Sequence, residues 1–297
     1  MNFDRFDFNT SSWNCPSLEQ IKRESKLNEK EIAAPSHIEE AKKRVKEMKK
    51  KSGNSWLTLP LWQNLEAVVY GMQLSNTEEY RTFPDYCVKN LEELRDFEFH
   101  LVKDPRIEIL LETIDYFKDQ VILLELEAPF SVLAALMNPI DLYACFDEKG
   151  ELLSEILYKL AQAEAEYVKR AVEAGTRILS LADPVGTMDM TGEKYYRQFC
   201  GESERYLLTL CEPYLNQAVM HICKKMSQSL VIGGLACADK YEGLDNTEDF
   251  TDALLRMADD PEIRFTGMTC IHDQSRSRKT SYIIRPNLAL DKAKERR

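Results

Sequence analysis

The chain lacks long apolar stretches, since none of its runs approaches the roughly 20 residues that a membrane-spanning helix needs. Its first residues, MNFDRFDFNTSSW, lack both the basic segment and the apolar segment of a secretory signal. It also lacks a positive net charge: its 297 residues carry a formal charge of −11, which disfavours a general binder of nucleic acid or anionic membranes. We therefore expect a cytoplasmic protein with no membrane and no nucleic-acid partner.

Histidine is scarce, with four residues, while eight cysteines are scattered along the chain. Scattered cysteines without a secretory signal are typical of reduced cytosolic thiols and do not indicate a disulfide framework. Most of them are expected to be small core residues. A functional role for any one cysteine must therefore come from its own surroundings.

Two regions differ in composition. Residues 1–55 hold a Ser/Asn-rich start and then a lysine-rich segment whose apolar residues fall at helical spacing, which predicts a helix over 36–53. Its basic run is either a solvated helix face or a surface for an acidic partner. We predict a helical N-terminal extension over 1–55 and a second domain over 56–297.

Residues 56–297 alternate helical patterns with short apolar runs. Strands are predicted over 121–130, 176–184, 214–223, 263–270 and 281–290. Helices are predicted over 83–100, 104–120, 151–175 and 192–213. Strands that alternate with long helices imply a parallel sheet, and the length of the chain favours an α/β fold of the (β/α)8 TIM-barrel type, complete or incomplete.

Catalytic groups in such barrels lie at the C-terminal ends of the strands. The polar residues at those ends are Glu127, Asp183, His221, Cys223 and Cys270. His221 and Cys223 alternate along a strand, so their side chains are expected on one face. An imidazole and thiolates suit zinc, and Cys270 is the natural third ligand.

Other interpretations of these residues stay open. His221 and the two cysteines could be ordinary core residues, or the thiol and imidazole could act as nucleophile and base. Further ligands could come from Cys237, Glu242, Asp245 or His272. Asp183 precedes a proline, so it either steers a substrate at a strand end or caps a turn.

Three segments carry a resemblance to a known family: LELEAPFSVLAALMNPIDLY, AGTRILSLADPVGTMDMTGEKYYRQF and NQAVMHIC. They resemble, in order, a proline-phenylalanine-serine segment, an alanine-aspartate-proline strand and a His-x-Cys strand of the uroporphyrinogen decarboxylase superfamily. The His-x-Cys strand is the mark of its zinc-dependent branch, the methylcobamide:thiol methyltransferases. The resemblance covers roughly residues 57–270.

The resemblance implies a zinc-dependent enzyme that moves a methyl group between a corrinoid and a thiol or similar small acceptor. It implies zinc ligands at His221, Cys223 and Cys270. The chain contains no Asp-x-His-x-x-Gly corrinoid-binding motif, so a partner protein is expected to carry the corrinoid. The chain departs from the family at Lys224, where glycine is usual, and at Glu127, whose side chain would narrow the pocket.

Two other functions remain compatible with the sequence. One is a decarboxylase-like lyase, although the arginine-rich stretch of the true decarboxylases is not present before residue 56. The other is a barrel without catalytic activity that serves as a binding protein. The sequence gives no indication of the oligomeric state.

Overall fold

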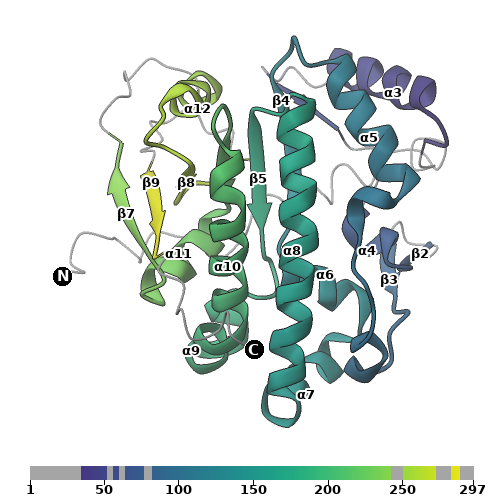
Figure 1. Cartoon of the computed structure of the whole chain (residues 1–297), viewed down its shortest axis with the longest axis vertical. Helices are drawn as coiled ribbons and strands as arrows, with labels where there is room; N and C mark the ends of the chain where they lie inside the picture. Colours follow the sequence, from purple (N-terminus) through teal and green to yellow (C-terminus); the bar gives the residue numbers. More distant parts are fainter. Residues whose placement is uncertain are drawn as a thin grey trace.

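The computed structural model describes residues 35–51, 56–59, 64–76, 82–241, 250–271 and 282–287, and it is built around one mixed β-sheet (Figure 1). Seven strands form this sheet in the order β1-β4-β5-β6-β8-β9-β7, and β2 and β3 form a separate antiparallel pair. The strands are β1 (Leu57–Thr58), β2 (Gln73–Asn76), β3 (Thr82–Asp85), β4 (Ile122–Glu127), β5 (Ile178–Ala182), β6 (Val219–Ile222), β7 (Ala236–Lys240), β8 (Phe265–Gly267) and β9 (Tyr282–Pro286).

The predicted α/β class is confirmed, and all five predicted strands are present as β4, β5, β6, β8 and β9. Strands β1, β4, β5, β6 and β8 are parallel, as predicted. The prediction was wrong in one respect: β9 is antiparallel to both of its neighbours, β8 and β7. Within the described residues the sheet ends at β1 and β7 without closing, so the incomplete form of the barrel is the one observed.

The helices alternate with the strands along the chain. They are α3 (Ile38–Lys51), α4 (Leu65–Val69), α5 (Pro105–Tyr116), α6 (Pro129–Leu136), α7 (Pro139–Glu148), α8 (Gly150–Ala174), α9 (Met188–Tyr195), α10 (Gly201–Cys211), α11 (Lys224–Ile232) and α12 (Phe250–Asp259). A π-helical turn (Tyr196–Cys200) joins α9 to α10. None of the helices in the described ranges combines the length and the apolar character needed to span a bilayer.

The two faces of the sheet are covered by different helices. In Figure 1, α8 and α10 stand side by side in front of β5. Leu179 and Leu181 belong to the core cluster that these helices share, whereas Ile178 belongs to a smaller cluster with Leu254 and Met257 of α12. Successive strand residues point to opposite faces, so α12 covers the face that would line the interior of a closed barrel.

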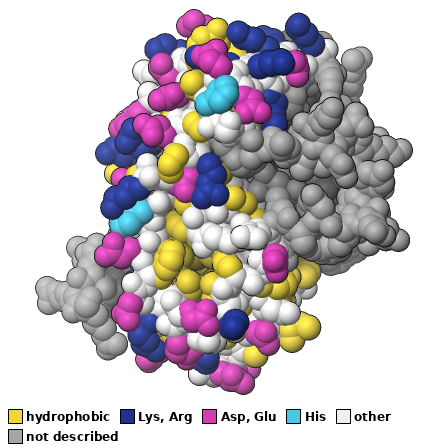
Figure 2. All heavy atoms as spheres, turned by 90° about the vertical axis from the view of Figure 1, so that its right-hand side faces the viewer, with side chains coloured by type: hydrophobic (Ala, Val, Ile, Leu, Met, Phe, Trp, Pro, Cys, Tyr) yellow, Lys and Arg dark blue, Asp and Glu magenta, His cyan; other side chains and the backbone are white. Residues whose placement is uncertain are grey.

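The predicted N-terminal helix is present as α3, although residues 1–34 and 52–55 lie outside the described ranges. Ala41 and Val45 of α3 are fully buried in the main core cluster. Its basic face packs on α5, where Lys42 and Lys46 lie over the ring of Tyr116. Figure 2 shows Lys and Arg interspersed with Asp and Glu at this end of the molecule, as expected of a solvated face. The division of the chain at residue 55 stays a prediction.

The helix predicted over 83–100 is wrong. The segment contains β3, an isolated bridge between Val88 and Met137, and one 3₁₀ turn (Leu91–Leu94). Pro84 lies inside β3, and a proline disfavours helical backbone in the residue before it. The 3₁₀ turn therefore buries Leu91 and Leu94 where a longer helix was predicted.

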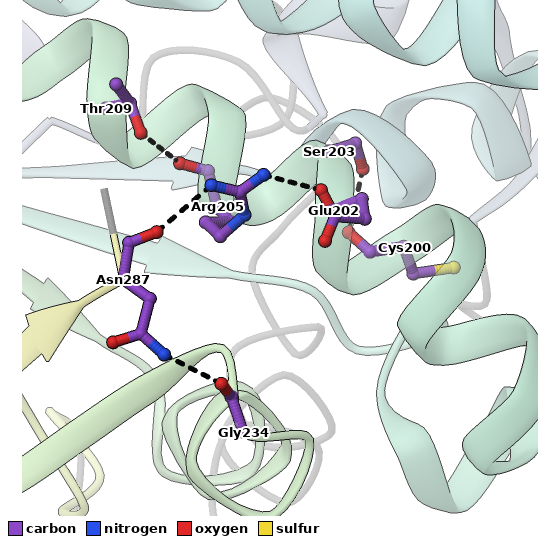
Figure 3. Close-up of polar contacts among 7 residues, drawn as sticks. All are labelled: Cys200, Glu202, Ser203, Arg205, Thr209, Gly234 and Asn287. Carbon is purple, nitrogen blue, oxygen red and sulfur yellow. Dashed lines mark hydrogen bonds and ion pairs between the residues drawn. The ribbon is translucent and has the colours of Figure 1, made fainter. Parts of the chain in front are cut away.

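The last strand is fastened to the helices by side-chain hydrogen bonds (Figure 3). Arg205 of α10 donates to the backbone oxygen of Asn287 (3.0 Å), just after β9. The side-chain amide of Asn287 donates to the backbone oxygen of Gly234 (2.8 Å), just before β7. These contacts fix the antiparallel edge of the sheet against α10 and α11.

Candidate functional site

The predicted strand-end residues lie along one edge of the sheet. Strands β4, β5 and β6 are parallel neighbours, and hydrogen bonds extend their pairing past the strand ends. The Ala128 amide donates to the oxygen of Ala182 (2.9 Å), and the Cys223 amide donates to the oxygen of Leu181 (2.8 Å). The structure therefore brings the ends of these three strands together, as expected of a parallel sheet.

His221 is fully buried on β6 and is held through both ring nitrogens. Its Nε2 lies 3.1 Å from the backbone oxygen of Thr269, and its Nδ1 lies 3.5 Å from Oγ of Ser180. A carbonyl oxygen only accepts, so Nε2 carries the proton and Nδ1 is the nitrogen with the lone pair. The ring also meets Phe250 edge-on, with 6.2 Å between centroids.

A strained turn presents Thr269 to His221. Met268, the residue before it, has φ +64°, a left-handed conformation that is uncommon for a residue other than glycine. The Met268 amide donates to Oγ of Ser227 (2.8 Å), a fully buried residue of α11. Strain of this kind persists only where surrounding contacts hold it, and here Ser227 and His221 supply them.

The two predicted cysteine ligands, Cys223 and Cys270, and the alternative Cys237 occupy different positions. Cys223 is half-buried and stands at the N-terminus of α11, after β6 has ended. Cys270 is buried and follows Thr269, so its segment lies against the His221 ring. Cys237 is exposed on β7, and two strands separate β7 from β6. At roughly 4.8 Å per strand that separation is about 14 Å, too far for a shared ion.

The donor set fits zinc in its chemistry. A zinc-binding histidine usually donates its other N–H to a backbone carbonyl, as His221 does to Thr269. Thiols at 223 and 270 are the soft ligands that zinc accepts. Within the described ranges, no three His, Cys, Asp or Glu side chains form a group that could hold a metal ion. The other candidate ligands, Glu242, Asp245 and His272, lie outside the described residues.

Asp183 is only 1% exposed and its carboxylate is engaged within the protein. Oδ1 accepts from the hydroxyl of Ser131 (2.5 Å) and from the amide of Gly186 (2.7 Å). A Cβ at position 186 would overlap the carboxylate, so only glycine fits there. These contacts support the turn-capping interpretation of Asp183; substrate steering by Asp183 stays a prediction.

A second carboxyl group, Glu204 of α10, bonds to Asp183 and accepts from the hydroxyl of Tyr196 (2.6 Å). Two ionised carboxylates cannot bond to each other, so a proton must lie between them. Burial raises the pKa of Asp183 to about 6, although the bonds from Ser131 and Gly186 favour its charged form. Burial, and after it the negative charge of Asp183, raise the pKa of Glu204 well above its ordinary value.

Three more acidic residues lie near the carboxyl ends of β4 and β5: Glu66 of α4, Glu127 of β4 and Glu164 of α8. Glu66 and Glu164 are each 4% exposed, and Glu127 is half-buried. Burial and the neighbouring acids raise the pKa of Glu127 and of Glu164, and burial raises the pKa of Glu66 to about 7.

Sequence reasoning named Glu127 but missed Glu66, Glu164 and Glu204, and it missed the serines around His221. A signal was available for Glu164, because it falls at helical spacing with Leu157, Leu160 and Ala161 on the buried face of α8. No local pattern marks Ser180 or Ser227, whose partners lie 41 residues away in each case.

The family model described as uroporphyrinogen decarboxylase (URO-D) matches residues 64–264, more than half of the chain. The chain belongs to the uroporphyrinogen decarboxylase family. The matched range includes β4, β5, β6 and α8, and so most of the site described above. The family resemblance predicted from the sequence is thereby confirmed.

Two curated relatives of this family member are methylcobamide:CoM methyltransferases. MtbA of Methanosarcina acetivorans is 21% identical over 167 residues, which are 54% of this chain and 49% of the relative. MtaA of Methanosarcina barkeri is 26% identical over 158 residues, 52% of this chain and 45% of the relative. The chain thus spans about half the length of the curated relatives it matches.

Among solved structures, a methyltransferase from Methanosarcina mazei is similar with a TM-score of 0.55 at 19% identity. The match covers 67% of this chain and 60% of that one. At this identity the similarity shows a shared fold.

Proposed function

We propose that this family member is a zinc-dependent methyltransferase that moves a methyl group from a corrinoid, carried by a partner protein, to a small thiol or similar acceptor. The observation that carries the proposal is the His221 ring, buried at a strand end with its tautomer set by Thr269, next to the Cys270 segment. Its methylcobamide:CoM methyltransferase relatives supply the reaction class.

In this proposal His221, Cys223 and Cys270 hold the ion. Zinc, when bound, would lower the pKa of an acceptor thiol and so make its thiolate available at neutral pH. The Thr269 carbonyl orients the imidazole, and Ser227 fixes the turn that carries Thr269. The N-terminus of α11, at Cys223, favours a negative charge at that position.

In this proposal the atoms that react in the methyl transfer are those of the partner's corrinoid and of the acceptor. The corrinoid would supply the methyl group to the acceptor thiolate, and its cobalt would keep the electron pair of the broken cobalt–carbon bond as the carbon–sulfur bond forms. The contribution of this chain is to position the acceptor thiolate at the edge formed by β5, β6 and the 268–270 turn.

Metal analysis tests the ligand set. Purified chain, stripped and then reloaded with zinc, is expected to retain about one ion per molecule, as a single site of this kind requires. His221→Ala and Cys223→Ser are expected to abolish retention, and the matched control Cys237→Ser, on exposed β7, should leave it unchanged. Equal zinc retention in all four proteins would refute the ligand assignment.

Methyl transfer tests the reaction class. Methylcobalamin incubated with coenzyme M and the zinc-loaded chain is expected to give cobalt(I), detected by its absorption spectrum under anoxic conditions. The rate should fall at least a hundredfold in Cys223→Ser and stay unchanged in Cys237→Ser. A chain that retains zinc yet gives no cobalt(I) with any small thiol would contradict the methyltransferase assignment and leave the metal site standing.

A further inference from the structure

Five buried or half-buried carboxyl groups from five different elements come together near the carboxyl ends of β4 and β5. They are Glu66 of α4, Glu127 of β4, Glu164 of α8, Asp183 after β5 and Glu204 of α10. Their charges act on one another: the ionised forms of Glu66, Glu127 and Asp183 all disfavour ionisation of Glu164. The fold has therefore gathered acids in a place where each additional negative charge is costly.

In the Asp183–Glu204 half of this group, internal donors reach Oδ1 of Asp183 and Oε2 of Glu204, whereas the other half is less well satisfied. Both carboxyl oxygens of Glu164 are buried and have no hydrogen-bond partner among the described residues, and the buried hydroxyl of Tyr70 has none either. Glu66 accepts only a long bond from the Glu127 amide (3.4 Å) besides its own backbone. A buried ionised carboxylate in this state would be strongly destabilising, whereas a protonated one is tolerated.

Among the described residues, the surroundings of α4 offer no counter-charge to Glu66. On α8 the facing polar groups are Glu164 and Tyr167, and on β4 the facing group is Glu127. Helix α6 contributes only Ser131, already bonded to Asp183. The one described cation that reaches α4 does so from α5.

That cation is Arg106. It donates to the backbone oxygen of Val68 (3.1 Å), while its Nε and Nη2 bond the Asp104 carboxylate at 2.7 Å each. Its charge is therefore matched by Asp104, and its bond to α4 is made to the backbone. Within the described part of the chain, protons are therefore the positive charge that remains for the acids around Glu66.

We propose that Glu66, Glu127 and Glu164 act as a pH-sensitive lock on α4, which is closed while they hold protons and loosens when the protons are lost. Helix α4 is suited to this because it has only five residues and begins at Asn64 in a left-handed conformation (φ 48°). Its Leu65 and Ala67 belong to different core clusters, so α4 holds the two clusters together at the carboxyl end of the sheet.

The direction of the effect follows from burial. The pKa of Glu66 is raised by burial to about 7, and neighbouring acids together with burial raise those of Glu127 and Glu164. A carboxyl group with a raised pKa in the closed state stabilises that state at low pH, and the stabilisation is lost as the pH rises through the raised value. The lock is therefore closed below about pH 6 and weakened above about pH 8.

Hydrogen exchange measured by mass spectrometry on the whole chain tests the lock. For peptides that cover 64–72, the opening constant, corrected for the intrinsic pH dependence of exchange, is expected to rise about tenfold between pH 6 and pH 8.5. In Glu66→Gln, which is neutral at every pH, it is expected to change by less than threefold. The matched control is Glu166→Gln, an exposed acid on α8 two residues from Glu164, which should behave as the wild type.

Two outcomes would overturn the proposal: a wild-type opening constant that does not change with pH, or a Glu66→Gln variant that keeps the full tenfold rise. If Glu66→Gln folds poorly, the opening constants of Glu164→Gln and Glu166→Gln give the same comparison. Both substitutions lie on α8, which is 25 residues long. Neither measurement involves zinc or methyl transfer, so the result is independent of the proposed function.

Discussion

The ends of β5 and β6 are neighbours in the sheet, yet they are built in opposite ways. At the end of β5, Asp183 receives bonds from Ser131, Gly186 and Glu204, all within the protein. At the end of β6, Cys223 is half-buried at a helix N-terminus, and the chain after β8 forms a strained turn against His221.

The difference separates a structural corner from a site with ligand-binding groups. Both strand ends satisfy the general rule that polar residues at the carboxyl ends of parallel strands mark function. Only the contacts show that Oδ1 of Asp183 is bonded within its own turn, whereas the β6 end carries an oriented imidazole against the segment that holds Cys270. Each prediction below tests one side of this comparison.

Asp183→Ala should have the largest effect. It leaves the Ser131 hydroxyl, the Gly186 amide and the Glu204 carboxyl without their shared acceptor, and we expect the free energy of unfolding in urea to fall by about 4 kcal/mol. Asp147→Ala, at an exposed aspartate on α7, should leave the free energy of unfolding nearly unchanged. A loss below about 1 kcal/mol for Asp183→Ala would mean that the corner is not structural.

The pH dependence of global stability should be set by the buried acids near the ends of β4 and β5, with Glu66 as the group that can be tested. The pKa of Glu66 is about 7 in the folded chain against an ordinary 4.5, so the stabilisation is complete below pH 4.5 and lost as the pH rises towards 8. The difference corresponds to about 3 kcal/mol. Urea unfolding at pH 5 and pH 8 should show this loss in the wild type and in Glu166→Gln, and a loss smaller by about that amount in Glu66→Gln.

Ser227→Ala should have the smallest effect on stability and the most specific effect on the β6 end. It removes the acceptor of the strained Met268 amide, which should cost about 1 kcal/mol and weaken zinc retention roughly tenfold. Ser203→Ala is the matched control, because the buried Ser203 hydroxyl of α10 donates to the backbone oxygen of Cys200 (2.8 Å, Figure 3), as the Ser227 hydroxyl does to that of Cys223 (3.1 Å). Equal zinc affinity in the two variants would show that the turn does not position the site.

The strand ends were predictable because apolar runs and parallel pairing are local patterns with a simple geometric consequence. β4, β5 and β6, and with them the placement of Asp183, His221 and Cys223 at one edge, follow from such patterns. The antiparallel direction of β9 and the position of α12 were not predictable, because they depend on which face of the sheet remains uncovered. The partners of His221 could not be predicted either, because Ser180 and Thr269 contact it only through the register of β5 and the turn after β8.

The position of β9 between β8 and β7 has a consequence for the order of folding. Among the described strands, β7 pairs only with β9, although β7 leaves the ribosome before α12, β8 and β9 do. The parallel strands from β1 to β6 can assemble as they emerge, but β7 has no neighbour until Tyr282–Pro286 has been synthesised. During synthesis the exposed Cys237 and its strand therefore depend on the latest described strand of the chain for every one of their ladder bonds.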